Sequence, residues 1–347
     1  MSERIQLAHG AGGERMEGFI KQYILKSFSS SSGEVPLDML DDAAVIDDIV
    51  FSTDSHTIHP LIFPGGDIGT LAVAGTINDV AVLGATPIAL SAAFIIEEGF
   101  PVEIFERIIT SMGDSARNAG VPIITGDTKV VEKGAIQEFM ITTSGIGRRS
   151  EILDSNIKEV RRYREFPGRW ILDRNLKAGD KIIISGNIGE HGVALLSLRY
   201  GFKTEVKSDV APIHTLMETV LKTGGVVAAK DPTRGGLSNT VNEFSEKSQV
   251  GIILYEDAIP IPTGVQAACD MLGIDPLEIG NEGKIVLGVV KEKADEVLEA
   301  MKKHPLGRNA SIIGEVTNEV RGVVLETTVG GRRILQKPLG DPIPRIC

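Results

Sequence analysis

Apolar side chains recur along the chain with two different spacings. Residues 14–28 and 102–119 carry them every three or four positions, which predicts amphipathic helices. The apolar stretch from Ile68 to Leu83 is followed by Gly84 and predicts a buried helix that ends at this glycine. A serine run at residues 29–32 predicts a loop. Short apolar runs predict strands at residues 43–46, 49–52, 89–96, 121–125 and 138–146.

A second alternating series follows a polar, arginine-rich stretch. It begins with a predicted strand at 181–185 and continues with helices near 190–200, 212–223, 236–248, 263–272 and 292–302 and strands near 251–255, 284–290, 310–316 and 321–327. Two α/β (α+β) domains of similar size account for this pattern. The charged run at 158–165 is typical of a solvated face. We therefore expect an N-terminal domain over 1–150, a linker or surface insertion over 151–176, a C-terminal domain over 177–330 and a tail over 331–347.

Composition narrows the class of protein. The chain has 347 residues, of which 42% are hydrophobic and 5% aromatic, as in an ordinary soluble α/β protein. There is no apolar run of about 20 residues, and the N-terminus lacks the apolar core of a signal peptide, so we expect a cytoplasmic protein. The net charge of −11 disfavours nucleic acid or an anionic membrane as a partner.

The two cysteines exclude a disulfide framework and a four-thiolate zinc site. Cys269 lies in an apolar helical stripe, where a thiol is typically a small core side chain. Cys347 instead follows Pro338, Pro342 and Pro344, which favour an extended arm. Such a segment is either a frayed terminus with an accidental cysteine or a mobile arm that carries an exposed thiol.

Several loops combine glycine with chemistry-bearing side chains. The segment His9-Gly-Ala-Gly-Gly13 precedes a predicted helix and could either bind an anion through its amides or form a plain turn. In the second domain, Asp231-Pro-Thr-Arg-Gly-Gly236 places a carboxylate, a hydroxyl and a guanidinium in one turn, which is a credible phosphate or metal site. Glu282, between Asn281 and Gly283, is a candidate base or a solvated turn residue.

Five aspartates lie near predicted strand ends or within the apolar helix. They are Asp41, Asp42, Asp54, Asp79 and Asp127. A buried carboxylate is costly unless it is paired, hydrogen-bonded or bound to a cation, and each of these residues alone could be a satisfied structural aspartate. If they converge, their hard oxygen ligands imply Mg²⁺, with water and substrate phosphates in the remaining positions. Such a cation would also screen an acidic protein from an acidic nucleotide.

Four motifs resemble the nucleotide-site motifs of the PurM-like ATP-binding superfamily. They are Asp41-Asp-Ala-Ala-Val, Asn78-Asp-Val-Ala, Thr125-Gly-Asp-Thr-Lys and Asp231-Pro-Thr-Arg-Gly-Gly. Within this superfamily, the His9 loop, Phe63-Pro-Gly-Gly, Asn281-Glu-Gly-Lys, His304-Pro-Leu-Gly and the ending Pro344-Arg-Ile-Cys347 resemble the HypE family of hydrogenase maturation factors. The resemblance covers nearly the whole chain and implies a two-domain PurM-like fold, a homodimer formed through the N-terminal domains, and a site for ATP.

The resemblance also implies a reaction and partners. In the HypE family, the carbamoyltransferase HypF carbamoylates a terminal thiol, and ATP drives dehydration to a thiocyanate. The HypC–HypD complex is the implied acceptor, and the cyanide becomes a ligand of the iron in [NiFe] hydrogenase. By this resemblance Cys347 is the thiol, while Lys129 and Glu282 manage the protons of the carbamoyl nitrogen.

The implied ligands follow by motif match. Mg²⁺ is assigned to Asp42, Asp54, Asp79 and Asp127, with Asp231 as an additional candidate. ATP contacts are assigned to His9, Gly10, Gly12, Gly13, Asn78, Asp79, Thr128, Asp231 and Thr233. Two alternatives stay open: another enzyme of the superfamily that acts on a free small molecule, and a non-catalytic ATP-binding scaffold that docks through its tail.

Overall fold

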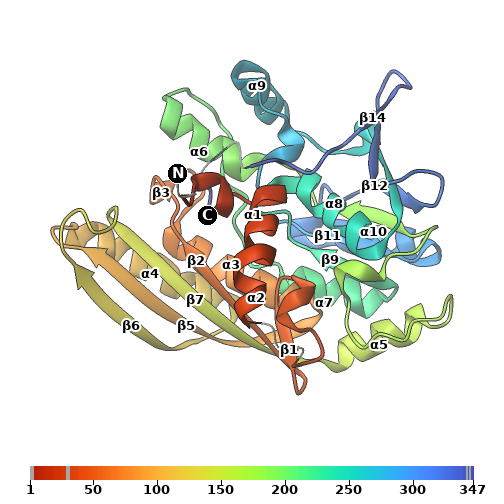
Figure 1. Ribbon diagram of the computed structural model, residues 1–347, viewed down its shortest axis with the longest axis horizontal. Helices are drawn as coiled ribbons and strands as arrows, with labels where there is room; N and C mark the ends of the chain where they lie inside the picture. The colour runs from red at the N-terminus through yellow and green to blue at the C-terminus, as the bar shows by residue number, and fades with distance from the viewer. Residues whose placement is uncertain (1–3, 29–31, 341–342, 344) are drawn as a thin grey trace.

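The computed structural model describes residues 4–28, 32–340, 343 and 345–347. These residues form two α/β units that lie side by side, each built on its own sheet (Figure 1). The two sheets divide the chain near residue 150, where the hydrophobic pattern changes. Most of the predicted serine loop, residues 29–31, lies outside the described residues.

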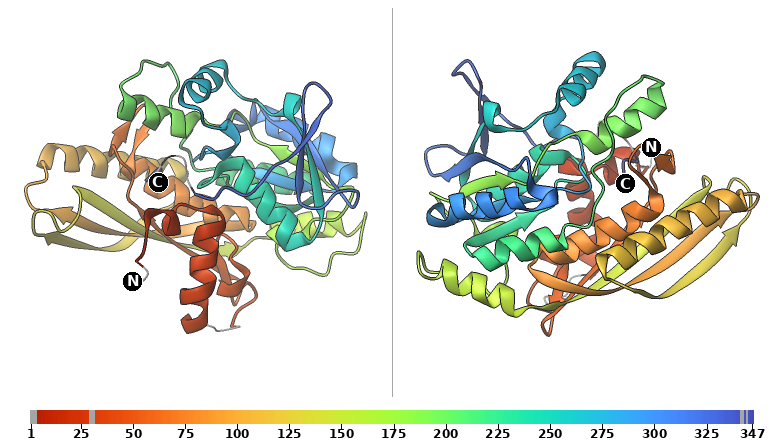
Figure 2. Two further views of the ribbon diagram at one scale, coloured as in Figure 1. Left: turned by 45° about the horizontal axis from the view of Figure 1, so that its top comes forward. Right: turned by 180° about the vertical axis from the view of Figure 1, so that it is seen from behind.

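The N-terminal sheet has the order β1-β2-β7-β5-β6. Its strands are β1 (Ala44–Ile46), β2 (Ile49–His56), β5 (Ala85–Glu97), β6 (Ile123–Val131) and β7 (Phe139–Arg149), and a separate short pair is formed by β3 (Ile62–Phe63) and β4 (Gly66–Asp67). All neighbours in the large sheet are antiparallel except β5 and β6. The helices α3 (Ile68–Val82) and α4 (Val102–Ala119) lie against one face of this sheet (Figure 2).

Helix α3 is buried almost along its whole length, as its apolar sequence predicted. It is enclosed because the sheet covers one side and the C-terminal unit packs on the other. Asp67 begins the helix by accepting hydrogen bonds from Gly69 N and Thr70 N, which satisfies two amides that have no partner within the helix. The helix therefore holds any polar residue on its surface in a fixed position between the two units.

The C-terminal sheet has the order β14-β13-β10-β12-β8-β11-β9. Its strands are β8 (Lys181–Ile184), β9 (Val226–Lys230), β10 (Gly251–Tyr255), β11 (Val286–Val289), β12 (Ser311–Thr317), β13 (Val323–Glu326) and β14 (Arg332–Ile334). The helices of this unit are α6 (Glu190–Tyr200), α7 (His214–Thr223), α8 (Gly236–Ser248), α9 (Thr263–Leu272) and α10 (Ala294–Lys303). Cys269 is buried in α9, as expected for a core thiol, and burial raises its pKa to about 11.

The predicted N-terminal helix is present as three consecutive segments, α1 (Gly13–Phe19), a π-helical turn η2 (Ile20–Ile24) and α2 (Leu25–Phe28). Most other predicted elements match observed ones, but the strands β3, β4, β9 and β14 and one helix within 151–176 were not predicted. Two strands extend beyond the apolar runs from which they were predicted. Strand β2 ends at His56 and β6 at Val131. Asp54 and Asp127 therefore lie within strands rather than after them.

The expectation of a linker or surface insertion at 151–176 is wrong for most of this segment. It contains the helix α5 (Glu151–Val160), whose residues Leu153, Ile157 and Val160 belong to the hydrophobic core of the C-terminal unit. Trp170 and Asp173 are buried as well. Only the charged run lies largely on the surface, because it occupies the end of α5 and the turn after it. The packing of this segment was hidden in the sequence by its many arginines.

The expected tail also begins later than residue 331, because β14 (Arg332–Ile334) adds an antiparallel strand to β13. The chain then crosses to the N-terminal unit, and its described end lies close to the middle of the molecule (Figure 1). Ile343 and Ile346 are 0% and 1% exposed, in a hydrophobic cluster to which both units contribute. Along the described part of the chain, no helix combines the length and the apolar character needed to cross a membrane.

Candidate active site

A cavity of about 280 Å³ lies between the two units. It is lined by the loop before α1, the loop before β1, one side of α3, the segment after β9 and the end of the tail. The lining includes Gly12, Gly13, Asp42, Asp54, Asp79, Lys230, Asp231, Thr233, Arg234, Glu243, Glu282 and Cys347. Elements more than 300 residues apart in the sequence thus meet at one place.

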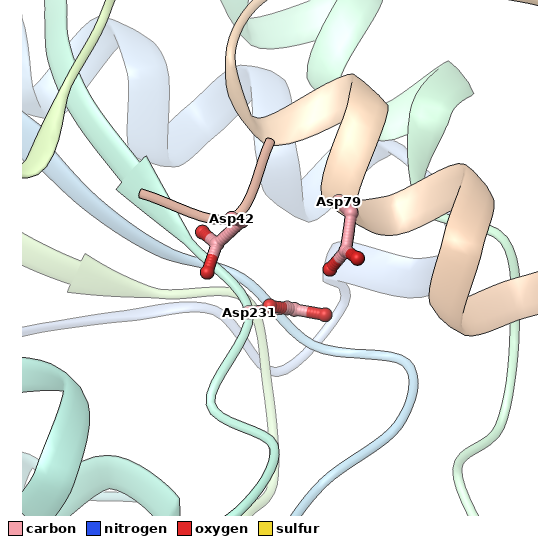
Figure 3. Close-up of side chains that lie close together, drawn as sticks. All are labelled: Asp42, Asp79 and Asp231. Carbon is pink, nitrogen blue, oxygen red and sulfur yellow. The ribbon is translucent and has the colours of Figure 1, made fainter. Parts of the chain in front are cut away.

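Three carboxylates form a cluster on one wall of this cavity. Asp42 comes from the loop before β1, Asp79 from α3, and Asp231 directly follows β9, and each directs a carboxylate toward the other two (Figure 3). One oxygen of each lies within 4.8 Å of the others. Ser52 Oγ donates to Asp79 Oδ2 at 2.6 Å, whereas Asp231 Oδ2 is buried without a hydrogen-bond partner. This arrangement can accept a cation or protons.

Burial and the negative charges of neighbouring carboxylates raise the pKa of each member of the cluster; for Asp42 this neighbour is Asp173. Burial is the larger cause, and it raises the pKa of Asp42 to about 6 and that of Asp231 to about 8. The pKa of Asp79 is raised well above its ordinary value by burial and by the charges of Asp231, Asp54 and Asp42. At neutral pH the cluster therefore holds protons unless a positive charge replaces them.

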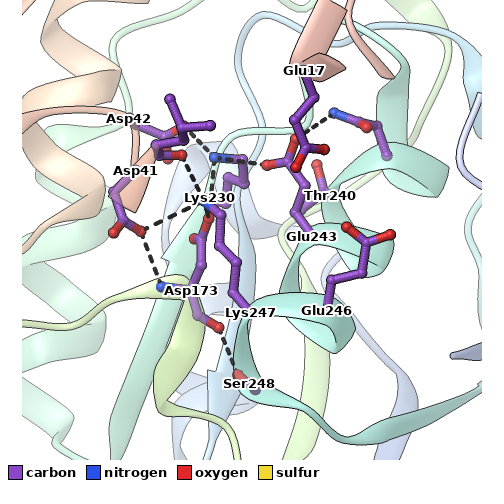
Figure 4. A network of polar contacts seen from close by, with 12 residues as sticks. Glu17, Asp41, Asp42, Asp173, Lys230, Thr240, Glu243, Glu246, Lys247 and Ser248 are labelled. Carbon is purple, nitrogen blue, oxygen red and sulfur yellow. Dashed lines mark hydrogen bonds and ion pairs between the residues drawn. The ribbon is translucent and has the colours of Figure 1, made fainter. Parts of the chain in front are cut away.

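Two lysines lie in the polar network around Asp42, the buried Lys230 and the half-buried Lys247 (Figure 4). Lys230 forms an ion pair with Asp42 and lies 3.2 Å from Glu243 and 3.4 Å from Asp173. Lys247 lies 2.7 Å from Asp173. Burial opposes the charge of Lys230, yet the neighbouring carboxylates raise the pKa of this lysine well above its ordinary value. Lys230 therefore stays charged and fixes one oxygen of Asp42.

Asp173 was missed by the sequence analysis, because it lies in the segment expected to be a linker. Asp173 is 1% exposed, and its Oδ2 accepts hydrogen bonds from Lys230 and Lys247. The signal that could have found it is a lone carboxylate after the apolar residues Trp170-Ile-Leu172, since an acidic residue in such a setting usually has a partner.

Arg234, Glu282 and Cys347 line the same cavity. The pKa of Arg234 is raised, first by Cys347 and further by Asp54 and Glu282. Glu282 is 2% exposed, and its Oε1 has no hydrogen-bond partner. Burial and the charges of Asp231 and Asp209 raise the pKa of Glu282 well above its ordinary value. The proton is therefore held more tightly by Glu282 than by an exposed glutamate, and Glu282 can exchange it with a group in the cavity.

The expectation of an exposed thiol is wrong for the tail in this structure. Cys347 is half-buried, and it lines the main cavity as well as a neighbouring cavity of about 280 Å³. The reason is that two tail isoleucines are buried in the core beside it. The tail thus brings its thiol into the space that the carboxylates enclose.

Some predicted site residues lie outside the cavity. His9 stacks on Phe19 with a ring distance of 5.2 Å, and Gly10 lines only the neighbouring cavity. Asn78 is fully buried, but its side chain binds the C-terminal unit by donating to Ala211 O and Glu282 O and by accepting from Ile213 N. Its position next to Asp79 on the helix therefore serves to join the two units.

The motif Thr125–Lys129 also lies apart from the cavity of its own chain. Asp127, Thr128 and Lys129 are exposed on β6, which is the edge strand of the N-terminal sheet. Asp127 and Lys129 pair with each other at the surface. Of the aspartates assigned to a metal, the structure therefore brings together Asp42, Asp54 and Asp79, adds Asp231, and leaves Asp127 outside.

Known proteins match the chain over both units. Family models for the N-terminal and C-terminal domains of AIR synthase related proteins match residues 40–149 and 177–326. A carbamoyl dehydratase HypE from Azotobacter vinelandii is 44% identical over 99% of this chain and 97% of its own length. The chain belongs to the HypE family.

Solved structures of the HypE family share the fold. A crystal structure of a HypE–HypF complex contains a chain that is 42% identical, with a TM-score of 0.83 over 92% of this chain and 99% of that one. A HypE structure in complex with ATP is 39% identical, with a TM-score of 0.79 over 99% and 100% of the two chains. These relatives confirm the PurM-like two-domain architecture that the motifs implied.

The raised pKa of Asp231 predicts how stability depends on pH. Between about pH 4 and pH 8 the folded protein keeps a proton that the unfolded chain has lost, so the free energy of unfolding falls as the pH rises through this range. Asp231→Asn removes this contribution. From pH 5.5 to 8, the variant should lose about 2–3 kcal/mol less stability than the natural chain.

Urea unfolding followed by the fluorescence of Trp170, the single tryptophan, measures this difference in the presence of a chelator. Asp270→Asn, at an exposed position, is the matched control and should follow the natural chain. Parallel pH dependences for Asp231→Asn and the natural chain would contradict the assignment.

Proposed function

We propose that this chain is an ATP-dependent carbamoyl dehydratase of hydrogenase maturation, acting on a carbamoyl group carried by its own Cys347. The observation that carries the proposal is the position of Cys347 in one cavity with the carboxylate cluster, Arg234 and Glu282. Membership in the HypE family supports the same reaction. A free small-molecule substrate would not require the tail to enter this cavity.

The chemistry requires activation of an oxygen. The oxygen of a thiocarbamate is a poor leaving group, so its loss at neutral pH depends on conversion to a phosphate ester. The carbamoyl oxygen attacks the γ-phosphorus of ATP, and ADP leaves. The C–O bond then breaks, and its electron pair leaves with the phosphate. The nitrogen loses its two protons over these steps, and a thiocyanate remains on Sγ. Such a transfer depends mainly on positioning and on neutralising the phosphates.

The residues of the cavity suit these steps. Cys347 Sγ carries the carbamoyl group, and the half-buried Arg234 supplies a positive charge near it. Glu282, whose pKa is raised by burial and by neighbouring carboxylates, can exchange protons with the carbamoyl nitrogen. Gly12 and Gly13 line the cavity before α1, and they adopt positive φ angles of 78° and 71° that favour glycine.

We also propose that the carboxylate cluster binds Mg²⁺. The cluster fits a hard divalent cation because three carboxylate oxygens converge and Asp231 Oδ2 is buried without a partner. Asp42, Asp79 and Asp231 would hold the ion, with Asp54 nearby. When bound, Mg²⁺ would neutralise phosphate charge. It would also replace the protons that burial otherwise forces onto these carboxylates.

Magnesium should therefore stabilise the protein more at pH 8 than at pH 5.5, because protons compete for the same oxygens. At a hundredfold excess over its dissociation constant, Mg²⁺ should add about 2.7 kcal/mol to the free energy of unfolding at pH 8. Asp79→Asn should remove most of this gain, whereas Asp270→Asn should keep it. Titration calorimetry gives a second measure, and an unchanged magnesium affinity in Asp79→Asn would refute the ligand assignment.

We further propose a homodimer formed through the N-terminal units. The strands of that sheet expose large apolar side chains. They include Ile49, Phe51, Ile88, Ile124 and Val130. Strand β6 is also an unpaired edge, which a second chain can cover. The proposed roles of Asp127, Thr128 and Lys129 require a second copy of the chain, since these residues lie outside the cavity of their own.

Sedimentation equilibrium should give a dimer for the natural chain and a monomer for Phe51→Asp, because a buried charge without a partner opposes the interface. Ile334→Asp, which changes an exposed apolar residue of the C-terminal sheet, should stay dimeric. If Lys129 acts across the interface, mixing the inactive variants Lys129→Ala and Cys347→Ala should restore part of the activity. A monomeric natural chain at micromolar concentration would contradict the dimer.

We propose HypF as the carbamoyl donor and the HypC–HypD complex as the acceptor, in the cytoplasm. A HypE relative crystallised with HypF supports the first partner. Transfer of labelled cyanide carbon from Cys347 to isolated HypC–HypD is the measurement for the second, and no transfer would refute it.

Mass spectrometry of the peptide that contains Cys347 tests the reaction itself. After incubation with HypF, carbamoyl phosphate and ATP, we expect a carbamoylated peptide that then loses one water. Cys347→Ala should form no product while still binding ATP, whereas Cys269→Ala should remain active, because Cys269 is a core residue. ATP use without this mass loss would favour a small-molecule enzyme, and the absence of ATP use would favour a scaffold.

A further inference from the structure

The end of the tail is held along residues 57–59 by backbone hydrogen bonds. Thr57 N donates to Cys347 O at 3.1 Å, and His59 N donates to Arg345 O at 3.4 Å. Arg345 Nε donates to Thr57 O at 2.6 Å, and Arg199 donates to Arg345 O at 2.8 Å. These bonds set the position of the tail but leave the carbonyl of the residue between, Ile346, for a different partner.

That partner is His191, at the start of α6. Its Nε2 lies 2.8 Å from Ile346 O, and its ring is fully buried. A carbonyl oxygen only accepts hydrogen bonds, so Nε2 must carry the proton. The ring packs edge-on against Phe63, with the ring centres 5.3 Å apart. His191 takes no part in the proposed chemistry, because it does not line the main cavity.

The other ring nitrogen of His191 is held by Ser208. Nδ1 lies 2.7 Å from Ser208 Oγ, and the same Oγ accepts a hydrogen bond from Val210 N at 3.1 Å. Because Ser208 Oγ already accepts from Val210, its own proton is free to point at Nδ1. This chain of hydrogen bonds selects the tautomer with its proton on Nε2, which is the tautomer that can bind the tail.

We propose that His191, oriented by Ser208, is a positioning residue that holds the docked tail and so keeps Cys347 in the cavity. This inference rests on the proposed function, because the contact would serve to keep a carbamoylated thiol in place while it is dehydrated. The hydrogen bond itself exists without any reaction. A modest bond of this kind suits a tail that must also leave the cavity to meet an external donor.

The test compares two amides at position 191 that differ in reach. The amide nitrogen of glutamine can take the place of Nε2, so His191→Gln should keep the bond to Ile346 O. The side chain of asparagine is one carbon shorter, so His191→Asn should lose the bond while keeping a polar side chain. His214→Ala, a partly buried histidine of α7, is the control outside the tail site.

The first measurement is the rate at which iodoacetamide alkylates Cys347 in the absence of substrates. Loss of one buried hydrogen bond should raise this rate about five- to tenfold in His191→Asn. His191→Gln and His214→Ala should stay within about twofold of the natural chain. Equal rates in His191→Asn and the natural chain would overturn the proposal, and so would equal increases in His191→Asn and His191→Gln, which would indicate a packing effect.

The second measurement separates the two chemical steps. Carbamoylation by HypF should be unchanged or faster in His191→Asn, while the subsequent loss of water should slow about five- to tenfold and recover in His191→Gln. If His191→Asn does not fold, Ser208→Ala leaves the ring in place and should raise the alkylation rate about two- to threefold, and no increase would overturn the proposal. Failure of the natural chain to dehydrate its thiol would refute the proposed function, whereas the alkylation rates would still decide the role of His191.

Discussion

The burial of three carboxylates around one cavity is the constraint on which the rest of this structure depends. Asp42, Asp79 and Asp231 repel one another where water cannot screen them, and their raised pKa values express that cost. The protein offsets part of it with two positive charges. Lys230 forms an ion pair with Asp42, and Arg234 lines the same cavity. This arrangement supports the proposed sites for Mg²⁺ and for phosphate.

The same constraint links the cavity to the stability of the two-unit assembly. Helix α3 supplies Asp79 to the cavity, and the preceding residue, Asn78, binds three backbone groups of the C-terminal unit. One of these groups is the carbonyl of Glu282, so the helix and the segment that carries Glu282 are fixed relative to each other. Positions of catalytic groups that come from different units are thereby set to within the tolerance of a hydrogen bond.

The proposed function sets a different requirement for the tail. It must be held in the cavity during dehydration and released to meet an external donor. Two buried isoleucines and a few hydrogen bonds to backbone carbonyls hold it. Most of these hydrogen bonds are made to the backbone of the tail rather than to its side chains, so they fix the position of Cys347. Contacts of this modest strength allow one thiol to serve an external donor and an internal site in turn.

The sequence by itself determined the periodic elements, the two-unit division and the family, because these depend on local spacing and on short motifs such as Asp231–Gly236. It also identified most of the cavity lining, including Asp42, Asp79, Glu282 and Cys347. Only the tertiary structure decided which partners these residues have. Asp173 reaches Lys230 from a segment that looked like a linker, Asn78 joins the units, and Asp127 and Lys129 lie on a distant edge strand. The physical reason is that burial and pairing of a charged side chain depend on segments far away in the chain, as the contact of His191 with Ile346 across 155 positions illustrates.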